Sequence, residues 1–221
     1  MRIAPAALLV LIAVFPMSAC GVSDPLQMKY FQTYSQRKYD GVVSQNADFS
    51  CGAASLATLS TYYWGRNVSE VYVLKILEAR YPDKKAWAMK LKTGFSLDDL
   101  EFAAAALGFN AQSVEISVDE LEKLDGPIIV HLNKGQFQHF SVLRMTKDGT
   151  YYLADSIVGK VGYASHEFEE QYTGAALAIW LDDSPLPQHS PITTVRDGLS
   201  VSSTLGSSIR SYRRPFGEKL F

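Results

Sequence analysis

The chain has 221 residues, a formal net charge of −2 and 47% hydrophobic residues. This length is enough to bury one sizeable core, and the near-neutral charge provides no basic surface of the kind that binds nucleic acid. The four histidines lack the paired spacing of a zinc site, so we expect neither a metal nor a cofactor.

The first twenty residues have the pattern of a secretory signal peptide. Residues 4–15 form an apolar run that is too short for a comfortable transmembrane helix, and small residues precede Cys20. These small residues resemble a bacterial lipobox, which would make Cys20 the site of a lipid anchor. Because Met17 fits that motif poorly, ordinary cleavage near Ala19 is the alternative. Either interpretation of residues 1–20 predicts export from the cytoplasm.

The segment that follows, 21–39, is polar and aromatic and is interpreted as a linker. Residues 42–45 predict a short strand, after which a turn leads into a helix. This helix begins at Cys51 and runs to about Trp64, because apolar residues recur at helical spacing and Gly65 provides a stop.

Cys51 would be the only thiol left in the chain after export, since Cys20 lies at the processing site. An unpaired cysteine is a liability in an oxidising compartment unless it is buried or used. In the first turn of a helix, the dipole and the unpaired backbone N–H groups favour its thiolate. By position alone, Cys51 fits a nucleophile and a small buried packing residue equally well.

Three further helices are predicted from capping residues and apolar spacing, over residues 69–81, 96–108 and 117–124. In the first of them, Val71, Leu74 and Leu77 are expected to share the buried side.

Strand patterns replace helical spacing after residue 126. Strands are predicted over residues 127–132, 139–145, 150–155 and 175–181, with a short helix over 165–172. Helices first and antiparallel strands second predict an α+β domain, which we place at 40–183. The last segment, 184–221, is rich in Pro, Ser and Thr and predicts a flexible tail, with a partner-docking segment as the alternative.

The hairpin formed by the second and third strands decides whether His139 and Asp155 can meet. A three-residue loop over 147–149 would place Ser141 opposite Asp155, so that His139 lies diagonally across from Asp155 on the same face, within hydrogen-bond reach. A two-residue loop over 148–149 would place the two side chains on opposite faces. We favour the three-residue loop.

Each of these residues also has a plainer interpretation. A lone histidine on a strand is more often structural than catalytic, and an aspartate at a strand end usually caps or turns. Gln45 would ordinarily be a solvated loop residue. His131 competes with His139, but no acidic residue follows it at hairpin distance.

Taken together, the residues resemble one family. Gln45, six residues before Cys51, and the segment 51–56 resemble the opening motif of the bacteriocin-processing, double-glycine-leader cysteine peptidases of the papain-like superfamily. Other segments are similar to the middle helix, the histidine motif, the aspartate motif and the close of that family, in the order 95–108, 139–143, 153–155 and 168–177. The similarity covers about residues 40–181.

The resemblance implies a papain-like fold, with N-terminal helices packed on a C-terminal antiparallel sheet, and a role for each residue of the set. Cys51 would be the nucleophile, and His139 the general base and then the acid. Asp155 would orient the imidazole. Gln45 would donate a side-chain N–H to the oxyanion, beside the backbone N–H of Cys51.

Two departures from the family pattern stand beside the site. Ser50 occupies a position where the family often has Asp, and Ser156 one where it has Pro. The chain also lacks exporter domains and carries its own export signal. It therefore looks more like the exported stand-alone members, including those associated with secretion of functional amyloid in Gram-negative bacteria.

This narrower resemblance implies a periplasmic cysteine peptidase whose partner is a protein or peptide client of a secretion system, amyloid clients included. The alternative is a non-catalytic, peptidase-like binding module that recruits a secreted client. A thiol acyl- or amidotransferase is a third interpretation.

Overall fold

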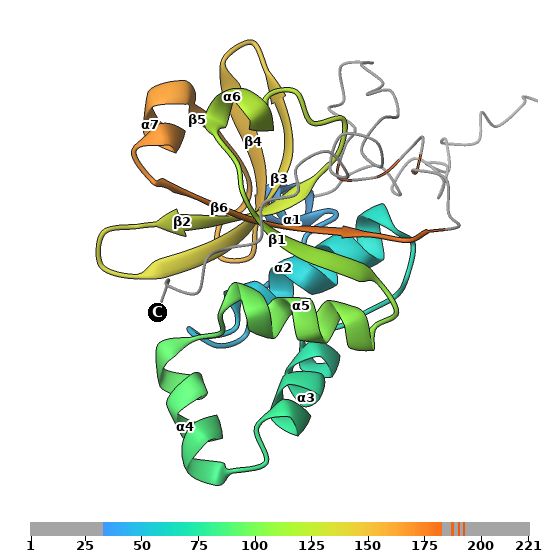
Figure 1. Ribbon diagram of the computed structural model, residues 1–221. Helices are drawn as coiled ribbons and strands as arrows, with labels where there is room; N and C mark the ends of the chain where they lie inside the picture. The colour runs from blue at the N-terminus through green and yellow to red at the C-terminus, as the bar shows by residue number, and fades with distance from the viewer. Residues whose placement is uncertain (1–32, 183–186, 188–189, 191, 193–221) are drawn as a thin grey trace, which may run out of the picture. The chain divides into compact units, whose positions relative to one another are not determined.

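Six antiparallel strands and the helices before them make up most of what the computed structural model describes, which is residues 33–182 together with 187, 190 and 192 (Figure 1). The chain divides into two units, Met1–Thr33 and Tyr34–Phe221, and the fold concerns the second. The predicted signal peptide and most of the predicted linker and tail lie outside the described residues.

The helical half consists of α1 (Tyr34–Tyr39), α2 (Cys51–Thr58), the π-helical turn η2 (Leu59–Tyr63) that continues α2, α3 (Glu70–Arg80), α4 (Lys84–Thr93) and α5 (Leu97–Ala106). The strands are β1 (Asn110–Glu115), β2 (Ile128–Asn133), β3 (Gln138–Lys147), β4 (Thr150–Asp155), β5 (Gly159–Ala164) and β6 (Tyr172–Trp180). Two short helices, α6 (Val118–Leu121) and α7 (Ser165–Glu169), lie between strands. This order confirms the predicted α+β class.

The sheet order is β1-β6-β2-β3-β4-β5, so the last strand of the chain returns between the first two. All neighbouring strands are antiparallel. Figure 1 shows α2 and α5 against the sheet, where α2 contacts β3 and α5 contacts β1 and β6, while α3 packs on these two helices. The sheet thus presents β3 to the helix that begins at Cys51.

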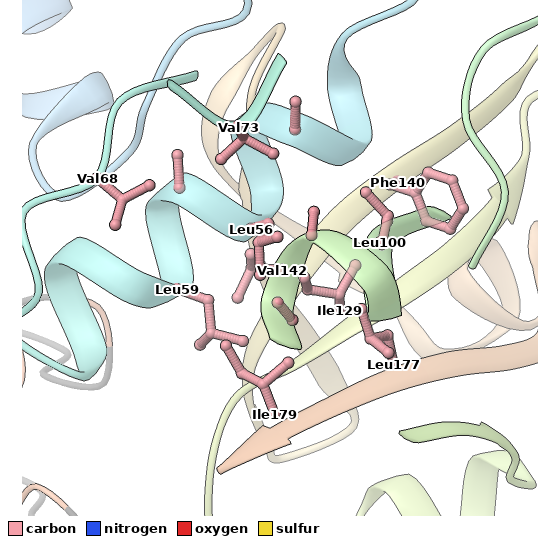
Figure 2. Packing of buried hydrophobic residues seen from close by; sticks show 14 of the residues in the cluster. Leu56, Leu59, Val68, Val73, Leu100, Ile129, Phe140, Val142, Leu177 and Ile179 are labelled. Carbon is pink, nitrogen blue, oxygen red and sulfur yellow. The ribbon is translucent and has the colours of Figure 1, made fainter. Parts of the chain in front are cut away.

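Apolar side chains fill both faces of the sheet. Leu56 of α2 and Leu59 of η2 belong to the cluster on the helix-covered face, together with Val142 of β3 (Figure 2). Leu143, the next residue of β3, belongs to a second cluster with Tyr151. Because successive side chains of a strand point to opposite faces, a strand covered on both faces is a run of buried residues.

The helices predicted from capping residues are confirmed. The hydroxyls of Ser69, Ser96 and Ser117 each accept a backbone N–H of the helix that follows, and Ser96 and Ser117 form capping boxes with the acidic residue three positions on. Leu77 is buried as predicted, but one detail is wrong: Val71 is 54% exposed, and Val73 is buried in its place.

Other predictions require correction. Residues 42–45 form no strand; they are irregular chain, in which the N–H of Val43 bonds to Thr58 Oγ1 and the N–H of Gln45 to the carbonyl of Ser156. Part of the predicted linker is the helix α1, and the predicted helix 165–172 ends at Glu169 because Tyr172 starts β6. The sequence patterns did not predict α4, β1 or β5.

Candidate active site

His139 and Asp155 form a hydrogen bond across the β3–β4 hairpin. His139 Nε2 lies 2.9 Å from Asp155 Oδ2, and both residues are only 2% exposed. An ionised carboxylate only accepts hydrogen bonds, so the ring donates through Nε2. This leaves Nδ1 as the nitrogen that is available to another group.

The loop of this hairpin differs from the predicted one. Lys147 pairs directly with Thr150, so the loop has two residues, Asp148 and Gly149, both with the positive φ that such a turn requires (50° and 70°). The predicted three-residue loop is therefore wrong.

A β-bulge on β3 nevertheless restores the predicted register. Met145 pairs with Tyr152 and Leu143 with Leu153, which leaves Arg144 as an extra residue on β3. The next steps of the ladder place Ser141 opposite Asp155. His139 and Asp155 thus lie on one face, as the three-residue loop would have placed them.

The second carboxylate oxygen of Asp155 is held by the turn that follows β4. Oδ1 accepts the backbone N–H of Ile157 at 2.8 Å and that of Val158 at 3.1 Å. Burial raises the pKa of Asp155, but the bond from His139 and these two N–H donors outweigh it, so the net pKa is lowered. The carboxylate is therefore charged and fixed in orientation.

Cys51 is the first residue of α2 and is a buried free thiol. Its side chain interacts with the ring of His139 and raises the pKa of that ring. Burial lowers the pKa of His139, but the hydrogen bonds to Asp155 and Cys51 raise it by more, to about 9. At neutral pH the ring is therefore an imidazolium.

The helix start and the strand are held close together. Ser55 Oγ donates to the carbonyl of Phe140, next to His139, at 3.1 Å. Gly52 allows this approach, because a Cβ there would lie 3.0 Å from both methyl groups of Leu100 and 3.2 Å from the Phe140 ring. No side chain caps α2, since the Ser50 hydroxyl bonds instead to the carbonyl of Ala47.

Gln45 lies in the loop before α2, where its amide is fixed by two hydrogen bonds. Nε2 donates to the carbonyl of Ala47 at 2.9 Å, and Oε1 accepts the hydroxyl of Ser156 at 2.7 Å. The carbonyl of Ala47 can only accept, so this contact decides which end of the amide is the NH₂ group, and one of its two protons is given to Ala47. Ser156, the residue after Asp155, thus holds the amide of Gln45 in place.

A buried carboxylate that the sequence analysis missed anchors the same loop. Glu70 of α3 is 2% exposed and accepts both the backbone N–H and the side-chain Nδ2–H of Asn46. Its sequence position carried no signal, because acidic residues in the first turn of a helix are ordinary. Only the tertiary contact shows that Glu70 holds the residue next to Gln45.

His131, the competing histidine, lies on β2 and has different partners. Its Nδ1 is 2.9 Å from Thr173 Oγ1, and its ring packs against Phe140. Burial and the nearby charge of His139 lower the pKa of His131. The carboxylate of Asp155 bonds to His139, so His139 is the better candidate for acid–base work.

Among the residues that the structure describes, no group of three or more His, Cys, Asp or Glu side chains has the arrangement to hold a metal ion. None of the described helices has both the length and the apolar composition needed to cross a bilayer.

The chain is similar in sequence to known proteases. The chain is 30% identical over 154 residues to the "Probable functional amyloid protease FapD" of Pseudomonas aeruginosa, and 25% identical over 151 residues to that of Pseudomonas fluorescens. These matches cover 70% and 68% of this chain, and 66% and 65% of the relatives. The chain thus spans just under two thirds of the length of either relative.

A solved structure shows the fold. The peptidase domain of Streptococcus ComA, a bi-functional ABC transporter involved in a quorum-sensing pathway, matches with a TM-score of 0.55 at 24% identity, over 65% of this chain and 99% of that domain. The profile of the Peptidase C39 family matches residues 40–184. The resemblance found in the sequence is confirmed, and the chain belongs to the peptidase C39 family.

Proposed function

We propose that this protein is an exported cysteine peptidase that cleaves a peptide bond in a client of a secretion system. The observation that carries the proposal is the buried hydrogen bond between His139 and Asp155, on a ring that also interacts with the thiol of Cys51. A nucleophile, an acid–base group and a group that orients it are what acyl transfer through a thiol requires.

In the first half of the reaction, the thiolate of Cys51 attacks the carbonyl carbon of the scissile bond and forms a C–S bond. His139 then gives its proton to the leaving nitrogen as the C–N bond breaks, which releases an amine and leaves a thioester. In the second half, His139 takes a proton from water, whose oxygen attacks the thioester and releases a carboxylate and the free Cys51. Asp155 keeps the ring aligned through both halves.

The developing oxyanion needs hydrogen-bond donors at the start of α2. The backbone N–H of Cys51 is one proposed donor. The other is the side chain of Gln45, whose Nε2 carries a second proton besides the one bonded to Ala47. The bond from Ser156 supports this role, because it keeps the oxygen of the amide away from the position of a donor.

The rest of the chain and the client belong to the same proposal. The name of the Pseudomonas relatives connects them with functional amyloid, which supports a secreted, amyloid-forming client here. We place the signal peptide at 1–20, with a lipid anchor at Cys20 as one option, a linker at 21–39, the peptidase domain at 40–183 and a tail at 184–221. The proposed compartment is the periplasm.

The test is mass spectrometry of new protein N-termini in the periplasm and medium of a wild-type strain and of a strain with Cys51→Ala. Client N-termini created by the peptidase are expected in the wild type and are expected to be absent from the Cys51→Ala strain. The matched control is His131→Gln, a histidine outside the proposed set, which is expected to leave processing intact. Undiminished processing with Cys51→Ala would rule out the thiol mechanism and favour a binding module.

A further inference from the structure

Two residues beyond the last strand are buried in the domain. Ile192 is 0% exposed and belongs to the apolar cluster beneath α2, and Ser190 is 2% exposed. Both lie outside the family match, which ends at residue 184. The composition of this stretch predicts a flexible tail, but these two residues contact the core.

Their hydrogen bonds connect the helix to the strand. Ser190 Oγ donates to the carbonyl of Tyr62 in η2 at 2.5 Å, and Arg144 Nε of β3 donates to the carbonyl of Ile192. The N–H of Ile192 also bonds to Ser190 Oγ, at 3.3 Å. The two residues thus bridge η2 and the β-bulge of β3.

This bridge lies at the far end of the helix and strand from the candidate active site. Tyr62 lies eleven positions after Cys51 in sequence, and Arg144 lies five positions after His139. At about 1.5 Å per residue in a helix and about 3.3 Å in a strand, both intervals span about 16 Å. The helix and strand are therefore matched in length between the two points where they are joined.

The bridge also reaches the residue that sets the hairpin register. Arg144 is the extra residue of the bulge, and it is 6% exposed. A buried guanidinium needs acceptors, and the carbonyl of Ile192 is one of them. Moving the chain at Ile192 would therefore disturb the bulge that aligns His139 with Asp155.

We propose that Ser190 and Ile192 are positioning residues, which clamp η2 to β3 and thereby hold Cys51 against His139. The clamp rests on the proposed function, because it concerns the pairing of the proposed nucleophile and base. The clamp gives a role to two residues outside the family domain. The pairing of Cys51 with His139 then depends on Ser190 and Ile192.

The experiment measures alkylation of Cys51 by iodoacetamide at about pH 6 in the full chain, followed on the peptide that contains Cys51 so that Cys20 does not interfere. A thiol paired with an imidazolium reacts far faster at this pH than a free one. Ile192→Ala is expected to slow alkylation at least about tenfold, and Ile192→Val to recover most of the rate. The matched control is Ile116→Ala, an isoleucine buried in the apolar cluster on the other face of the sheet, which is expected to react like the wild type.

The outcomes separate the two proposals. If wild-type Cys51 reacts no faster than a model thiol, the proposed function fails. If the wild type reacts fast and Ile192→Ala reacts equally fast, or no slower than Ile116→Ala, the clamp is overturned, even if the melting temperature has fallen. Should Ile192→Ala not fold, Ser190→Ala, which removes only a hydroxyl, is measured instead. An alkylation rate within twofold of the wild type would then overturn the clamp.

Discussion

The imidazole of His139 and the carboxylate of Asp155 meet on one face of the β3–β4 hairpin, although a two-residue loop joins these strands. In a regular ladder, that loop would place the two side chains on opposite faces. The bulge at Arg144 removes the conflict, because it inserts one residue into β3 between the loop and the site. Two local irregularities together produce the alignment on which the proposed reaction depends.

The first prediction concerns the charge of Asp155. Asp155→Asn removes the carboxylate that helps to hold the pKa of His139 at about 9. The pKa of His139 is expected to fall by more than about one unit, or about 1.4 kcal/mol, because burial then disfavours the imidazolium with less to oppose it. The measurement is an NMR titration of the histidine ring, with peptidase activity followed in parallel.

The control for this variant is Asp148→Asn, at the exposed tip of the same hairpin, which is expected to leave the His139 titration unchanged. A pKa of His139 that stays near 9 in Asp155→Asn would show that the carboxylate does not sustain the imidazolium.

The second prediction is a pH dependence of stability. The pKa of His139 is about 9 in the folded protein against an ordinary value of 6.5, so the folded state holds this proton more tightly. The stabilising contribution is therefore complete below about pH 6.5 and is lost as the pH rises through 9. Within this window, the free energy of unfolding is expected to fall by up to about 1.4 kcal/mol per pH unit.

Urea denaturation of the wild type and of His139→Gln between pH 6 and 10 measures this effect. The variant is expected to show a flatter dependence, because it has lost the group that titrates. Parallel curves for the two proteins would contradict the prediction.

The third prediction compares the contributions of Gln45 and Ser156 to kcat at the proposed oxyanion site. Gln45→Ala is expected to lower kcat by about 10²–10³-fold, as the loss of one oxyanion donor does in other enzymes, with little change in KM. Ser156→Ala removes the hydroxyl that bonds to Gln45 Oε1 and is expected to lower kcat by a smaller factor.

Steady-state cleavage of a client peptide measures both variants. The expected order is wild type, then Ser156→Ala, then Gln45→Ala. If Gln45→Ala raises KM at unchanged kcat, Gln45 binds substrate rather than stabilising the transition state.

The fourth prediction concerns the buried anchor of the same loop. Glu70→Gln places an NH₂ group opposite one of the two donors of Asn46, so a buried hydrogen bond is lost. The free energy of unfolding is expected to fall by about 1–3 kcal/mol, with slower client cleavage because the loop that carries Gln45 is less well held.

The comparison is Glu78→Gln, an exposed glutamate of the same helix, for which we expect changes within about 0.5 kcal/mol and normal cleavage. Urea denaturation and client cleavage check both variants. Equal effects at the two positions would remove the special role assigned to Glu70.

Some elements were predictable because short-range interactions specify them. The helices after Ser69, Ser96 and Ser117 each begin with a hydroxyl that accepts an N–H only a few residues away. The helix α4 was missed for a related reason: none of its residues is buried, so it has no apolar stripe to reveal it.

The edge strands were missed because their sequences are weak strand formers. β1 reads NAQSVE and β5 reads GKVGYA, and both are held in the sheet by their pairing with one neighbour, β6 and β4 respectively. Strand propensity depends on such neighbours, which lie far away in the chain for β1.

The sequence alone established the α+β class, the family and the candidate residues Gln45, Cys51, His139 and Asp155, because caps, periodicity and motifs are local patterns. The three-dimensional arrangement decided the bulge at Arg144 and the contact of Ile192 with the core. It also decided the hydrogen bonds from Ser156 to Gln45 and from Asn46 to Glu70. Most of these contacts join residues tens of positions apart in the chain. Their partners become neighbours only when the helices pack on the sheet, so no local pattern records them.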